Sequence, residues 1–91
     1  MNEQANPPVR RSGRVVDASG QPVRGAIVVV VSGTAPTPEV GIRTDENGRF
    51  IVALPAGTFH LQARAKTDTG SVNVEGGEET GEIVIRLGSQ Q

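Results

Sequence analysis

Short runs of β-branched and other aliphatic residues recur along the whole chain, and turn residues separate each run from the next. Within several runs apolar and polar side chains alternate, as at Phe50, Val52 and Leu54, which is the period of a strand with one buried face. No ten-residue stretch carries an apolar stripe at helical spacing. Such runs at intervals of about 8 to 12 residues are typical of an all-β sandwich or barrel. The expected strands are 13–17, 25–32, 41–44, 49–54, 58–65, 71–75 and 82–87.

The connections between these runs carry specific turn chemistry. Asp45-Glu46-Asn47-Gly48 predicts a hairpin turn, because aspartate can bond the backbone two residues on and an Asn-Gly pair tolerates positive φ. Residues 18–22 and 55–57 are expected to form further tight reversals. Residues 32–40 contain two prolines and should form a longer crossing loop.

The length and composition limit how the fold is held together. Ninety-one residues have room for one domain. The chain has no cysteine and a single histidine, His60, so neither a disulfide nor a Cys/His zinc cluster is expected. We expect a flexible leader or linker at 1–11, where Pro7 and Pro8 are consecutive, a domain at 12–88 and a tail at 89–91.

The charge and the shortage of aromatic residues exclude several kinds of partner. Nine basic and ten acidic side chains give a net charge of −1, which provides no positive field for a nucleic acid backbone. Phe50 and Phe59 are the only aromatic residues, too few for a core and also a stacking platform for bases or sugars. The longest apolar run, 26–31, is far shorter than the roughly 20 residues that cross a bilayer. We therefore expect no nucleic acid partner and no membrane insertion.

The candidates for chemistry are few. His60 should lie on the polar face of its strand, with no second histidine or cysteine beside it. Asp45, Glu46 and Asn47 could present oxygens to Ca²⁺, although the same residues fit a plain turn, and whether the loop 45–48 binds a cation stays open. The acidic stretch from Glu75 to Glu82 is expected to be a solvated loop. No catalytic, cofactor-binding or metal-binding residue is therefore expected.

The aliphatic run 26–31 is the feature that a self-contained sandwich explains least. If Ala26 and Val28 face the core together with Val30, then Ile27, Val29 and Val31 face outward. Neighbouring long polar side chains could shield these three residues. Alternatively, they form an interface with a second copy of the chain or with an adjoining domain.

Four linked elements of the sequence resemble the carboxypeptidase regulatory-like domain family. They begin with the turn-rich segment 13–29, which reads GRVVDASGQPVRGAIVV, and continue with TDENGRF at 44–50 and LPAGTFHL at 54–61. The resemblance covers about residues 12–87. Phe59 stands where this family usually has tyrosine, and the Gly-Tyr element that often follows is replaced by residues 66–70. The resemblance implies a seven-stranded, transthyretin-like (prealbumin-like) sandwich with Greek-key connections.

The same resemblance implies a function without turnover. Domains of this family look like accessory modules of secreted or cell-surface proteins, where they support structure or contact a protein partner. We expect such a role here, with an extracellular or cell-surface location and a partner protein, an adjoining domain or a second copy of the chain. A bacterial source fits the excess of arginine over lysine, eight to one. Two alternatives are a small-ligand-binding or hydrolytic transthyretin-like protein and a standalone scaffold. The chain carries no signal-peptide pattern, which leaves an intracellular location open.

Overall fold

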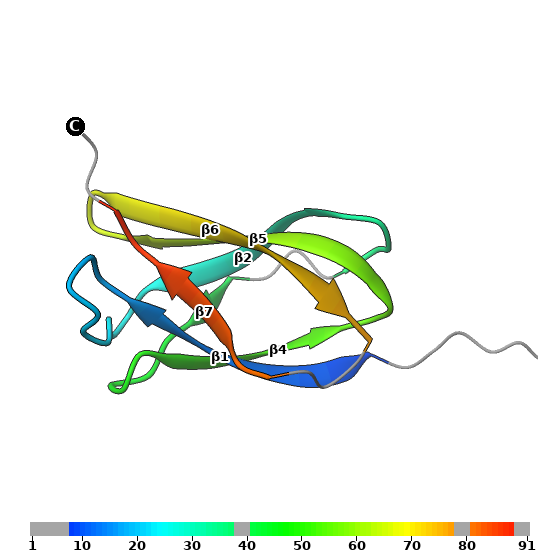
Figure 1. Cartoon of the computed structure of the whole chain (residues 1–91), viewed down its shortest axis with the longest axis horizontal. Helices are drawn as coiled ribbons and strands as arrows, with labels where there is room; N and C mark the ends of the chain where they lie inside the picture. Colours follow the sequence, from blue (N-terminus) through cyan, green and yellow to red (C-terminus); the bar gives the residue numbers. More distant parts are fainter. Residues whose placement is uncertain (1–7, 38–40, 78–80, 89–91) are drawn as a thin grey trace, which may run out of the picture.

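Two β-sheets packed face to face make up the domain in the computed structural model, which describes residues 8–37, 41–77 and 81–88 (Figure 1). One sheet has three strands in the order β4-β1-β7, and the other has four in the order β3-β2-β5-β6. The all-β, seven-stranded sandwich expected from the sequence is confirmed. The strands are β1 (Val9–Val16), β2 (Ile27–Gly33), β3 (Ile42–Arg43), β4 (Arg49–Leu54), β5 (Gly57–Ala65), β6 (Asp68–Gly76) and β7 (Ile83–Arg86).

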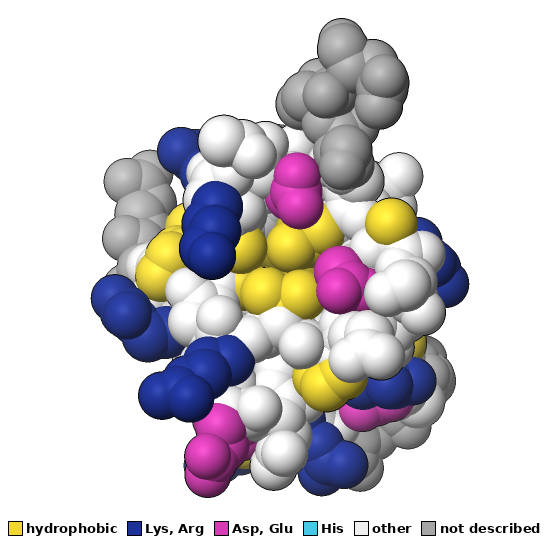
Figure 2. Space-filling view, turned by 90° about the vertical axis from the view of Figure 1, so that its left-hand side faces the viewer, with side chains coloured by type: hydrophobic (Ala, Val, Ile, Leu, Met, Phe, Trp, Pro, Cys, Tyr) yellow, Lys and Arg dark blue, Asp and Glu magenta, His cyan; other side chains and the backbone are white. Residues whose placement is uncertain are grey.

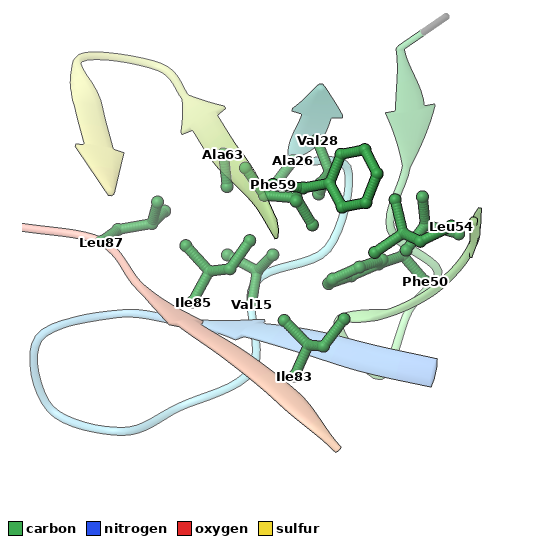
Figure 3. Close-up of a cluster of buried hydrophobic side chains, with 12 residues drawn as sticks. Val15, Ala26, Val28, Phe50, Leu54, Phe59, Ala63, Ile83, Ile85 and Leu87 are labelled. Atoms are coloured by element: carbon green, nitrogen blue, oxygen red, sulfur yellow. The ribbon is translucent and has the colours of Figure 1, made fainter. Parts of the chain in front are cut away.

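The core fills the space between the sheets with the inward side chains of both (Figure 3). Phe50 lies on the three-stranded sheet and Phe59 on the four-stranded sheet, so each sheet supplies one ring. Aliphatic residues provide the rest of the buried cluster. The cluster consists of Val15, Ala26, Val28, Phe50, Val52, Leu54, Phe59, Leu61, Ala63, Ile83, Ile85 and Leu87.

The first strand begins earlier than its sequence pattern predicts. Val9 pairs with Leu54 and Arg11 with Val52, so three residues of the segment expected to be a leader belong to β1. The strand continues to Val16 and also pairs in parallel with β7. Residues 1–7 and 89–91, the remainder of the expected leader and the tail, lie outside the described residues.

The prediction that Asp45-Glu46-Asn47-Gly48 closes a hairpin is wrong, because the strands on either side of this turn do not pair with each other. The turn forms: Gly48 N–H donates to the Asp45 carbonyl at 2.9 Å, and Gly48 takes a positive φ of 74°, which glycine adopts readily. However, β3 pairs with β2 and β4 pairs with β1, so the turn joins the two sheets. Local turn chemistry specifies a change of direction and not the strand that is paired next.

A bulge interrupts β2 at the end of the aliphatic run. Val30 pairs with Leu61 and Ser32 with His60, which leaves Val31 as the additional residue. Beyond the bulge, Gly33 faces Phe59. The strict alternation expected over residues 26–31 therefore holds as far as Val30 and ends at Val31.

Candidate interaction surfaces

His60 lies on the outer face of the four-stranded sheet, half-buried beside its cross-strand neighbour. Its ring Nδ1 is 2.7 Å from Oδ1 of Asn73, and the two residues pair directly across β5 and β6. Within residues 8–37, 41–77 and 81–88, no group of three or more His, Cys, Asp or Glu residues could hold a metal ion. The histidine is thus part of a cross-strand hydrogen bond and belongs to no metal-binding cluster in that part of the chain.

Two aspartates, Asp17 and Asp45, accept hydrogen bonds that stabilise the turns in which they lie. Oδ1 of Asp45 accepts hydrogen bonds from the backbone N–H groups of Asn47 at 2.8 Å and Arg49 at 2.9 Å. The bond from Arg49 contributes most to lowering the pKa of Asp45, followed by that from Asn47, and the charge of Arg49 adds to them, while desolvation acts in the opposite direction. This carboxylate therefore serves the turn.

Asp17 has the same role in the turn between β1 and β2. Its Oδ1 accepts bonds from the backbone N–H of Gln21 and from both the N–H and the hydroxyl of Ser19. The backbone bond from Gln21 contributes most to lowering the pKa of Asp17, and the bond from the Ser19 hydroxyl comes next. Residues 18–22 thus form the tight reversal that the sequence predicts.

The acidic stretch from Glu75, near the end of β6, to Glu82, just before β7, is described only in part. Glu75 accepts a hydrogen bond from the hydroxyl of Thr58 at 3.2 Å, and Glu82 forms an ion pair with Arg14 at 3.0 Å. Glu78 and Glu79 lie outside the described residues. The two described carboxylates belong to the outer faces of different sheets.

Ile27 and Val29 point outward from the four-stranded sheet, as expected, but the structure does not join Val31 to them. Ile27 lies between Arg43 on β3 and Arg64 on β5, and both Ile27 and Val29 are half-buried. A shallow hollow of about 260 Å³ lies over them, lined also by Gln62 and Arg64. Val31, in the bulge, is 47% exposed. Their role as an interface stays a prediction.

The outer face of the three-stranded sheet exposes two further aliphatic side chains. Ile51 on β4 is 52% exposed and Val84 on β7 is 41% exposed. Alternation along their strands places both on the outward face, where each is the one large aliphatic side chain of its strand, and an isolated exposed aliphatic residue is an ordinary surface feature.

Arginines surround these two aliphatic residues. Ladder register places four of them on the outer face of the three-stranded sheet, where Glu82 is the one acidic side chain among the described residues. A hollow of about 410 Å³ lies there beside Ile51. The four are Arg10, Arg14, Arg49 and Arg86.

An apolar groove lies between the two sheets, beside β4. Its volume is about 420 Å³. Val52 and Ala53 of β4 form one side, and Val30 and Ile42 of the other sheet form the opposite side. The remaining lining residues are Pro8, Pro36, Thr37 and Pro55.

Arg11 is a buried cation, although the sequence pattern places it in the expected leader. Its side chain is on the inward face of β1 and 4% exposed. One terminal nitrogen donates a hydrogen bond to the backbone carbonyl of Glu75 at the end of β6, and the other is 3.4 Å from the carbonyl of Gly81. The alternation with Gly13 and Val15, both buried, would have revealed its direction if β1 had been extended to Val9.

One end of the sandwich shows how charge is distributed. Figure 2 faces the end that carries the β5–β6 turn, and hydrophobic side chains gather in its middle. Basic and acidic side chains are interspersed around them. On this end the charges form no field of a single sign.

The described ranges contain no helix long and apolar enough to cross a membrane. A search of the curated proteins finds no match to the chain. The family model of the carboxypeptidase regulatory-like domain matches residues 12–88, the segment that contains most of β1 and all of β2 to β7. The chain is therefore a member of the carboxypeptidase regulatory-like domain family.

Proposed function

We propose that this domain is a non-catalytic accessory module that supports structure or contacts a protein partner within a larger secreted or cell-surface protein. One observation carries the proposal. The side chains best suited to chemistry serve the fold, while aliphatic side chains lie exposed outside the core. His60 bonds Asn73, and Asp17 and Asp45 hold turns.

The exposed aliphatic residues are not needed to complete the core. Ile51 and Val84 lie on the outer side of the sheet whose inner side already carries Phe50, Ile83 and Ile85. Removing apolar surface from water is favourable by about 25 cal/mol per Å². A partner that covered these side chains would gain this free energy on binding. A protein surface with a few aliphatic residues framed by arginine matches the composition of many interfaces.

Photo-crosslinking in cells that make the whole protein tests this function. A photoreactive phenylalanine analogue is placed singly at Val31, Ile51 or Val84, and at Glu46 in the exposed Asp45–Gly48 turn as the control. We expect a discrete protein adduct from at least one of the three positions and none from Glu46. Adduct yields at all three positions that equal the yield at Glu46 would contradict a protein-contact role.

An enzymatic function predicts a different outcome. The purified domain is assayed for hydrolysis with a panel of ester, amide and cyclic ureide substrates, alongside the variants His60→Ala and Asn73→Ala. We expect no turnover above the rate without protein. Turnover that His60→Ala abolishes would overturn the non-catalytic proposal and favour a hydrolytic transthyretin-like protein.

A further inference from the structure

We infer that the free edge of β4 binds an extended peptide strand that directs acidic side chains outward and aliphatic side chains inward. The inference rests on the proposed function and names the surface and the partner chemistry that it would use. It joins three separate features: the backbone of the β4 edge, the apolar groove beside it and the arginines of the adjacent outer face.

The backbone of β4 has hydrogen-bonding groups on its free side. The N–H of Val15 donates to the Gly48 carbonyl at 2.8 Å, and pairs that exchange bonds alternate along an antiparallel ladder. Phe50 and Val52 therefore direct their backbone groups toward β1, and Ile51 and Ala53 direct theirs away from it. The described residues provide no second strand on that side of β4.

The other sheet edges are shorter or partly occupied. On β6, the Thr69 carbonyl accepts a bond from Gly88 N–H at 2.9 Å, and the Glu75 carbonyl accepts one from Arg11. The edge strand β3 has only two residues. Charged residues, prolines and bulges usually prevent an edge strand from pairing with another chain. Residues 50–54 of β4 contain none of these features.

The groove gives the added strand a place for its inward side chains. A strand paired with β4 would direct alternate side chains toward the space between the sheets. The groove there is about 420 Å³ and is lined by Val30, Ile42 and Val52 together with prolines. This apolar lining suits two or three aliphatic side chains of the added strand. Fully burying a valine or leucine side chain contributes about 1.5–3 kcal/mol to the binding free energy.

The outer face selects acidic side chains. Arg49 is on β4, and Arg10 pairs with Ala53 from the neighbouring strand β1, so only the short alanine side chain lies between Arg10 and the edge on that face. Arg14 is already paired with Glu82, whereas Arg10 makes no ion pair among the described residues. Arg49 precedes Ile51 by two residues on the outward face of β4, and Arg10 pairs with Ala53, two residues after Ile51. A complementary strand therefore has acidic residues four positions apart, opposite residues 49 and 53, and a small neutral residue opposite Ile51.

A designed nine-residue peptide tests the inference. Its sequence is Thr-Val-Glu-Val-Thr-Val-Glu-Val-Thr, acetylated and amidated, and it is titrated into the ¹⁵N-labelled domain. We expect the largest chemical-shift changes at the amides of Ile51 and Ala53, with slower hydrogen exchange there. The peptide with lysine in place of both glutamates should bind at least about tenfold more weakly.

Matched controls separate the ladder from the charge. In the bound peptide the central threonine should direct its N–H toward β4, and the adjacent valine should direct its N–H away. N-methylation of that threonine should weaken binding at least about tenfold, and N-methylation of the valine should have a much smaller effect. The protein variant Arg10→Glu should weaken binding about fivefold or more, and Arg64→Glu on the opposite sheet should leave it unchanged.

Three results would overturn the β4 site: equal binding of the glutamate and lysine peptides, shifts centred on Ser71 and Asn73 of β6, or binding weaker than about 1 mM. Crosslinks from Val31 or Val84 in cells, without any peptide response at Ile51 and Ala53, would reject this site and retain the protein-contact function. An absence of crosslinks at all three positions would reject the protein-contact function itself.

Discussion

Phe50 and Gly13 lie directly opposite each other on β4 and β1, and the phenyl ring occupies the space where a side chain of residue 13 would begin. The other sheet repeats the arrangement: Phe59 faces Gly33 across β5 and β2, and its ring covers that glycine. Each of the two aromatic residues thus packs on a cross-strand glycine. A core with only two rings gains contact area because each ring lies against backbone.

Gly13→Ala should destabilise the domain by about 1–3 kcal/mol through overpacking. The added Cβ would meet the Phe50 ring and stand 2.8 Å from the Ile83 carbonyl oxygen, and a backbone atom of a paired strand has little freedom to move. Urea denaturation of the variant and the wild type measures the difference. Gly88→Ala is the control, since a Cβ there meets nothing within 4 Å. Equal midpoints for both variants would show that the ring moves aside at little cost.

The strands could be predicted from the sequence because side-chain alternation is a local property. The segment from Arg49 to Leu54 has the same bounds in the pattern and in the structure. The early start of β1 could not be seen, because Val9 and Arg11 pair with Leu54 and Val52, more than 40 residues away. Consecutive prolines at 7 and 8 suggested an irregular segment, although they restrict only their own positions and the residue before them.

The candidate surfaces were less predictable than the fold. The outward direction of Ile27 and Val29 follows from alternation, but the bulge that separates Val31 depends on the pairing of Ser32 with His60. Similarly, no pattern within β4 reveals that its free side borders a groove, because Val30 and Ile42 come from the opposite sheet. Predicting a surface that is built from several strands requires knowledge of which strands pair, and the alternation of side chains along the sequence does not contain that information.

Thr44→Val should cost about 1–3 kcal/mol of folding free energy. The Thr44 hydroxyl is buried, accepts a bond from Ala26 N–H at 2.9 Å and donates one to the Val23 carbonyl at 2.7 Å. Valine has nearly the same shape but leaves both backbone groups without a partner. Thermal or urea denaturation measures the loss.

Thr58→Val is the matched control for that substitution. The Thr58 side chain is exposed and bonds the Glu75 carboxylate at 3.2 Å, so its loss should change stability by no more than about 0.5 kcal/mol. If both variants lose the same stability, the effect at residue 44 is a general effect of replacing threonine and not the loss of buried hydrogen bonds.

The two turn aspartates predict a loss of stability in acid. Backbone hydrogen bonds lower the pKa of Asp17 and Asp45 in the folded protein, so their contribution is present above the unfolded aspartate pKa of about 3.9 and is lost as the pH falls through the folded-state values. Asparagine keeps an acceptor oxygen and does not titrate. The double variant Asp17→Asn and Asp45→Asn should therefore show a flatter fall in urea midpoint below about pH 4. Parallel curves for the variant and the wild type would refute the assignment.

Arg11→Met should destabilise the domain by about 1–3 kcal/mol even though methionine fills much of the same space. The Arg11 side chain runs from β1 to the backbone carbonyl of Glu75 and so connects the three-stranded sheet with the end of β6. Without it, that carbonyl loses its donor, and the amides near Gly76 and Gly77 should exchange faster with solvent hydrogen. Urea denaturation and hydrogen exchange measure the two effects. Arg10→Met, the exposed neighbour on the same strand, should stay within about 0.5 kcal/mol of the wild type. If Arg11→Met left both the urea midpoint and the hydrogen exchange near Gly76 unchanged, the buried guanidinium would not stabilise the contact between the sheets. Its hydrogen bonds in the folded protein would then be no stronger than those that it makes with water in the unfolded chain.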